Sequence, residues 1–149
     1  IEEKCQTFDD EIILVENIKK IFLLLLGKAF EKYGPEIEKN QQVLLSLSDL
    51  AIEAYLSEST LKRTIKNINR GLIEDQFDQI NMTKLYIYEA CQIVLKKSSD
   101  VVNSIIDLKS QDEIYSSITS KLKYSENPNV FELKTKIAEK IISENRYCF

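Results

Sequence analysis

Apolar residues recur with a helical period along almost the whole chain. Projected at 100° per residue, the apolar side chains between residues 18 and 33 cover an arc of about 200°, wider than the ~100° stripe of a surface helix. Leu24 alone lies on the opposite side. We therefore predict a helix from Asp9-Asp10 to Tyr33, ended by Gly34-Pro35, that contacts more than one neighbour. The arc comprises Ile18, Ile21, Phe22, Leu23, Leu25, Leu26, Ala29, Phe30 and Tyr33.

The next segment predicts a long helix from Pro35 to Arg70, with Gly71 as its stop. Its row of mostly apolar residues has spacings of three and four, typical of a helix that runs along an antiparallel neighbour. Only Glu58 in this row is polar, and we interpret it as reaching water or pairing with Lys62 rather than acting as a general base. The row is Leu44, Leu47, Ala51, Ala54, Glu58, Leu61, Ile65, Ile68 and Leu72.

The rest of the chain predicts three more helices. A third long helix spans residues 78–106, and two shorter amphipathic helices span 111–124 and 130–145. Short connections make the first three helices antiparallel neighbours. The predicted fold class is all-α: an antiparallel helical bundle of three long helices plus two shorter C-terminal helices, in a single domain over residues 1–149. The apolar row of the third helix is Ile80, Ile87, Cys91, Val94, Val101, Ile105 and Leu108.

Composition supports this assignment, because the 149 residues include only 3 Gly and 2 Pro. The longest apolar run, residues 21–26, lies between lysines and is much shorter than the ~18 residues that cross a bilayer. The net charge of −4 and the mixing of basic with acidic residues disfavour nucleic acid as a partner. We expect a cytoplasmic protein. The first residues, Ile1-Glu2-Glu3-Lys4, resemble the middle of a longer chain, so we expect a fragment.

Candidate chemistry is sparse. The chain contains no His, which excludes Ser/His/Asp and Cys/His nucleophiles and the Glu-x-x-His di-iron pattern. Its glycines are too far apart for a phosphate-binding loop. Cys5, Cys91 and Cys148 form no CxxC pair, and we expect reduced thiols, with Cys91 structural. Cys148 is second to last, which does not match a prenylation signal. We predict no catalytic, cofactor-binding or metal-ligating residue in this chain.

Three segments carry a resemblance to a known family: residues 27–64, "MTKLYIYEACQIV" (82–94) and "NPNVFELKTKIAEKIISENRYCF" (127–149). Together they resemble the C-terminal helical domain of bacterial acyl-CoA dehydrogenases, similar to the very-long-chain type. The resemblance implies a parent flavoenzyme of fatty acid β-oxidation that uses FAD and a glutamate base to form an α,β double bond. In the family these parts belong to the preceding dehydrogenase core. Neither Glu58 nor Glu89 is therefore assigned a catalytic role.

The resemblance also implies partners. We expect this domain to pack on the dehydrogenase core of the same chain, to support a homodimer and to make at most weak peripheral membrane contact. Leu24, opposite the main arc, would then be covered by the core or by another copy. One alternative is a helical protein-interaction or membrane-surface module without an enzymatic role. A free-standing coiled-coil scaffold is disfavoured, because Gly34-Pro35, Gly71 and Pro128 interrupt the heptads.

Overall fold

A computed structural model describes residues 8–71 and 76–144. These residues form α-helices and one 3-10 helix, and none of them lies in a strand. The predicted all-α fold class, with three long and two shorter helices, is confirmed. The elements are α1 (Asp9–Tyr33), η2 (Gly34–Lys39), α2 (Gln41–Arg70), α3 (Gln76–Ile105), α4 (Leu108–Lys121) and α5 (Val130–Glu144).

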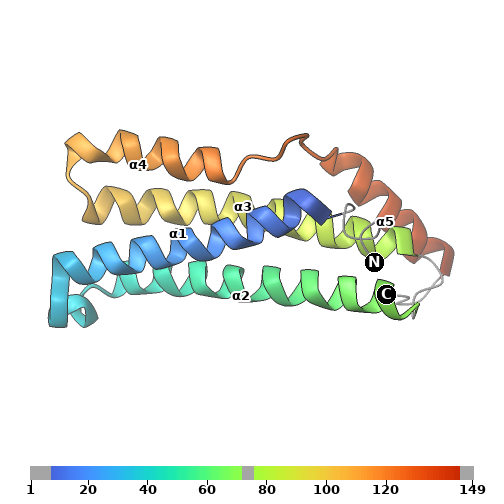
Figure 1. The fold of residues 1–149 in the computed structure, drawn as a ribbon, viewed down its shortest axis with the longest axis horizontal. Coiled ribbons are helices and arrows are strands. Elements are labelled where there is room, and N and C mark those ends of the chain that lie inside the picture. Colours follow the sequence, from blue (N-terminus) through green and yellow to red (C-terminus); the bar gives the residue numbers. More distant parts are fainter. Residues whose placement is uncertain (1–7, 72–75, 145–149) are drawn as a thin grey trace.

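The three long helices lie side by side as an antiparallel bundle (Figure 1). Each of α1, α2 and α3 contacts the other two, as the short connections predict. The shorter helices are both added to α3: α4 packs on one end of it and also touches α1, and α5 packs on the other end. The prediction that α1 has more than one neighbour is confirmed, because it contacts α2, α3 and α4.

The junction between α1 and α2 differs from the prediction. The predicted start of the second helix at Pro35 is wrong, because residues 34–39 form the 3-10 helix η2 and α2 begins only at Gln41. Gly34 has a φ of 50°, which ends α1 and redirects the chain. Ile37 is buried in η2 and anchors this turn to the core. The predicted stop of α2 at Gly71 is confirmed, with a left-handed φ of 64°.

The α3–α4 junction also begins earlier than predicted. Helix α4 starts at Leu108 and ends at Lys121, whereas the sequence pattern indicated residues 111–124. Leu108, which we placed in the core row of the third helix, is 84% exposed. The reason is that α3 ends at Ile105 and the backbone is extended at Asp107, so Leu108 opens a new helix with a different orientation.

The core of α2 is centred on a different row from the predicted one. Leu47, Ala54, Leu61 and Ile68 are buried as expected, but Leu44, Ala51, Glu58 and Ile65 are only half-buried. Because α2 lies against both α1 and α3, its buried stripe is centred between them and includes small polar residues that the apolar row omitted. The members that were missed are Val43, Leu50, Ser57 and Thr64.

Candidate functional site

Glu58 is held in an ion-pair network rather than poised for catalysis. Its Oε1 lies 2.6 Å from Nζ of Lys62 and 3.2 Å from Nζ of Lys19 on α1. Hydrogen bonds from Lys62 and then from Lys19 lower the pKa of this carboxyl group. The predicted pairing with Lys62 is confirmed. The ionised carboxylate accepts bonds from both lysines and links α2 to α1.

Glu89 and Cys91 also have structural roles: Glu89 pairs with a neighbouring helix, and Cys91 is buried in the core. Oε1 of Glu89 accepts a hydrogen bond from Nζ of Lys134 at 2.7 Å, which links α3 to α5. The free thiol of Cys91 is fully buried, and burial, with a smaller contribution from the charge of Glu11, raises its pKa to about 12. The predicted structural role of Cys91 is confirmed by this burial, because a protonated, buried thiol is unreactive. Cys5 and Cys148 lie outside the described residues.

A buried polar cluster at the start of α1 was not predicted. Glu11 is only 3% exposed and its pKa is raised, mainly by burial, while Lys84 of α3 counteracts the shift. Tyr124, which follows α4, is also buried and its pKa is raised by burial and by the charge of Glu11. A cavity of about 560 Å³ borders this cluster and is also lined by Asp10. The sequence spacing could have indicated that Glu11 is buried, because Glu11 falls on the buried row of α1 with Leu14, Val15 and Ile18.

The buried cluster lacks the composition of a metal centre. Within residues 8–71 and 76–144, no group of three or more His, Cys, Asp or Glu residues could hold a metal ion. The same part of the chain has no helix long and apolar enough to cross a membrane.

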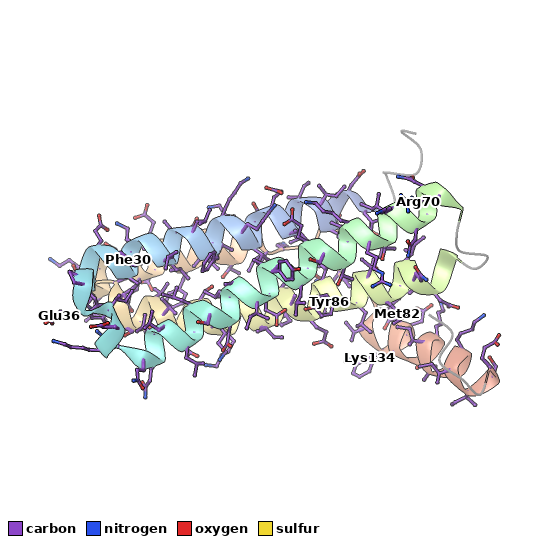
Figure 2. All side chains as sticks on the ribbon, turned by 90° about the horizontal axis from the view of Figure 1, so that it is seen from below. Phe30, Glu36, Arg70, Met82, Tyr86 and Lys134 are labelled. Atoms are coloured by element: carbon purple, nitrogen blue, oxygen red, sulfur yellow. The ribbon has the colours of Figure 1, made fainter. Side chains whose placement is uncertain are left out.

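One uncovered surface of the bundle is apolar. Apart from Ile13 near the start of α1, five large apolar side chains on α1 and α2 are between 52% exposed, for Ile52, and 70% exposed, for Tyr55. With the exposed Gly27 they define what we call the α1–α2 face: Leu23, Gly27, Phe30, Leu45, Ile52 and Tyr55. Figure 2 looks onto the side of the bundle formed by α1 and α2, with Phe30 near the end that carries Glu36. The sequence projection placed Leu23 and Phe30 on the apolar arc and did not predict their exposure.

Leu24 borders a separate groove on the other side of α1. The groove has a volume of about 630 Å³, and its apolar lining includes Ile105, Ile106 and Ile114 from the α3–α4 junction. Leu24 itself is 42% exposed. Its suggested cover by a partner stays a prediction.

Comparison with known proteins identifies the family. A model of the family described as acyl-CoA dehydrogenase, C-terminal domain, matches residues 17–119, which is more than half of the chain. This chain belongs to that family. The match runs from the third turn of α1 to the last turn of α4. This acyl-CoA dehydrogenase C-terminal domain therefore includes the α1–α2 face, and α5 lies outside the matched range.

Two relatives extend the match over most of the domain. A probable acyl-CoA dehydrogenase from Bacillus subtilis (strain 168) is 26% identical over 141 residues, covering 93% of this chain and 23% of the relative. The crystal structure of an acyl-CoA dehydrogenase complexed with FAD from Bacillus anthracis is 27% identical, with a TM-score of 0.87 over 93% of this chain and 24% of that chain. The domain thus spans about a quarter of these relatives. The predicted resemblance is confirmed, and similarity to the very-long-chain type stays a prediction.

Proposed function

We propose that this chain is the non-catalytic C-terminal helical domain of an FAD-dependent acyl-CoA dehydrogenase of fatty acid β-oxidation. In this proposal it packs on the dehydrogenase core of the same polypeptide, supports a homodimer and resides in the cytoplasm. The observation that carries the proposal is the family match over residues 17–119. The FAD-containing Bacillus anthracis relative adds support, because this domain corresponds to about a quarter of it.

The described carboxylates support a non-catalytic role. Acyl-CoA dehydrogenation needs a base that reaches the α-proton of the substrate beside a bound flavin. Glu58 and Glu89 are bonded to lysines of neighbouring helices, and Glu11 is buried under the turn that follows α4. Glu58 and Glu89 therefore connect helices, and Glu11 is enclosed within the protein. We assign FAD binding and proton abstraction to the dehydrogenase core of the longer polypeptide.

The proposal is tested most simply on the gene. The codons that precede Ile1 should encode a dehydrogenase core, and the full-length product should purify with FAD and oxidise a fatty acyl-CoA. A start codon directly before Ile1 would contradict the proposal, and so would a full-length product without flavin. These readouts do not depend on the oligomeric state of the protein.

A membrane-surface role is the alternative, and the exposed Phe131 and Ile142 of α5 are the observation in its favour. Electrostatic recruitment to anionic lipid also requires an accessible basic face. On α5, however, Lys134 pairs with Glu89 and Lys140 lies near Asp78. We therefore expect weak sedimentation with liposomes, equal with and without anionic lipid. Strong binding that requires anionic lipid would favour the membrane-surface module.

A further inference from the structure

The connection between α4 and α5 is bonded to the first turns of α1. Residues 122–129, which we call the strap, pass the start of α1 (Figure 1). Oδ2 of Asp10 accepts hydrogen bonds from the backbone N–H and the hydroxyl group of Ser125, at 3.1 and 2.5 Å. Directly before the strap, the carbonyl oxygen of Lys121 accepts a bond from Asn17 at 2.8 Å. These bonds join segments that are more than a hundred residues apart in the sequence.

The strap covers a buried carboxyl group. Tyr124 of the strap is buried, and its ring centroid lies 5.9 Å from that of Tyr88 on α3. Glu11 is buried too, and it lines the same cavity of about 560 Å³ as Tyr124 and residues 125–128. Because most of the residues that border this cavity belong to the strap, displacement of the strap would admit water to Glu11.

The surroundings of Glu11 do not balance its charge. Lys84 attracts the carboxylate, whereas Asp10 repels it. Burial is the largest effect and raises the pKa of Glu11. The ionised form is therefore more stable in water than under the strap. The titratable groups around Glu11 are one lysine, three carboxyl groups and two groups that burial keeps protonated: Lys84 and Cys91 of α3, Asp9 and Asp10 of α1, and Glu126 and Tyr124 of the strap.

We propose that protonation of Glu11 holds the strap closed on α1 and that ionisation of Glu11 opens it. Opening breaks the bonds between Ser125 and Asp10 and separates Tyr124 from Tyr88. It also loosens the start of α5, which follows the strap directly and buries no residue. This pH-dependent closure involves neither flavin nor acyl-CoA, so it stands independently of the proposed function.

The direction of the pH dependence follows from the pKa of Glu11 in the two states. In the open strap the solvated carboxyl group has its ordinary pKa of 4.5, and in the closed strap the pKa is higher. The closed state is therefore most favoured below pH 4.5 and loses this advantage as the pH rises through the higher pKa. Titration of Asp10 acts in the opposite direction, because a protonated carboxyl group accepts the bonds of Ser125 less strongly than a carboxylate does.

Hydrogen exchange at the Ser125 amide, measured by NMR on the 149-residue chain, tests the proposal. This amide is bonded to Asp10 only in the closed strap. Its protection factor, corrected for the intrinsic exchange rate, should fall as the pH rises from about 5 to about 8. The fall should be about tenfold for each pH unit that separates the two pKa values of Glu11. The amide of Leu61, in the buried row of α2, should stay much better protected, because the strap opens without unfolding the bundle.

Two variants assign the effect to Glu11. Glu11→Gln preserves the size of the side chain and removes its charge, so the Ser125 amide should stay protected at every pH. Asp10→Asn is the matched control, since it removes a carboxylate from the neighbouring residue. It should lower the protection at every pH, because a neutral acceptor is weaker, and should still show the fall with rising pH.

Four results would overturn the proposal. The first is a parent chain in which protection of the Ser125 amide is constant or increases with pH. The second is a Glu11→Gln variant that keeps the fall, and the third is an Asp10→Asn variant that loses it. The fourth is equal protection of the Ser125 and Leu61 amides, which would mean that the strap opens only when the whole bundle unfolds.

Discussion

Helices α2 and α5 look alike in sequence and differ in how they are covered. Both carry apolar residues at helical spacing, yet α2 buries eight residues and α5 buries none. Helix α2 lies against both α1 and α3, whereas α5 contacts α3 and forms ion pairs with it such as Lys134–Glu89. An amphipathic stripe therefore predicts a helix and its inner side. The number of neighbours decides how much of that side is buried.

The largest difference in stability is expected between truncations on the buried side and on the exposed side of α2. Leu50 is 1% exposed, so Leu50→Ala should lower the free energy of unfolding by about 2–5 kcal/mol through lost burial and a cavity. Leu45→Ala, at an exposed position of the same helix, should change it by less than ~0.5 kcal/mol. Urea denaturation at a concentration where the chain is monomeric measures both. Similar losses for the two variants would remove the distinction between a covered and an uncovered side.

The contact between α2 and α3 contains a buried pair of hydroxyl groups, whereas α5 buries no residue. Oγ1 of Thr64 and Oγ1 of Thr83 are 2.8 Å apart, and both residues are buried. Thr83→Val should cost ~1–3 kcal/mol, because the hydroxyl of Thr64 loses its partner without access to water. The double variant Thr64→Val/Thr83→Val should recover most of this loss. If the double variant is less stable than Thr83→Val alone, the hydroxyl pair contributes more to the free energy of unfolding than the mutual satisfaction of two buried hydroxyl groups.

The first turn of α1 gives a pH-dependent test of burial. Burial raises the pKa of Glu11 above its ordinary value of 4.5, with Lys84 opposing the shift and Asp10 favouring it. The folded state then binds the proton more tightly than the unfolded state, so this group lowers stability as the pH rises through its folded pKa. Glu11→Gln should therefore raise the melting temperature at pH 7, and the gain should shrink toward pH 4.5. If the gain in melting temperature instead grows as the pH falls, the ionised Glu11 stabilises the folded state, and the prediction is wrong.

The smallest effect is expected on α5. Lys134→Ala removes an exposed ion pair with Glu89 and should change global stability by less than ~1 kcal/mol. Because α5 buries no residue, its amides should exchange by local opening and faster in the variant, while those of α2 stay unchanged. Hydrogen exchange with mass spectrometry resolves the two helices. Equal acceleration in α2 would show that α5 unfolds only together with the bundle.

The sequence predicted where the helices begin and end better than it predicted which side of each helix is buried. The limits of α1 followed from Asp9-Asp10 and Gly34, which have local chemical causes, and the α2 stop followed from Gly71. The orientation of α2 depends on contacts with two helices at once, so Leu50 was missed and Leu44 was overvalued. No local pattern distinguishes these rows.

The functional surfaces depend even more on tertiary contacts. The resemblance identified the family without any site residue, and the ion pairs of Glu58 were anticipated only within α2, because Lys19 is distant in sequence. The burial of Glu11 depends on the turn after α4, more than a hundred residues away. The exposure of Phe30 follows from the absence of a described helix against that side of α1.

The central claim, that this domain is non-catalytic and depends on a separate core for flavin chemistry, is tested directly by titrating the 149-residue chain with FAD. Flavin fluorescence should show no binding at micromolar concentration, and palmitoyl-CoA should not be oxidised in the presence of an artificial electron acceptor. Binding of FAD at micromolar affinity together with oxidation of palmitoyl-CoA by this chain alone would contradict the account.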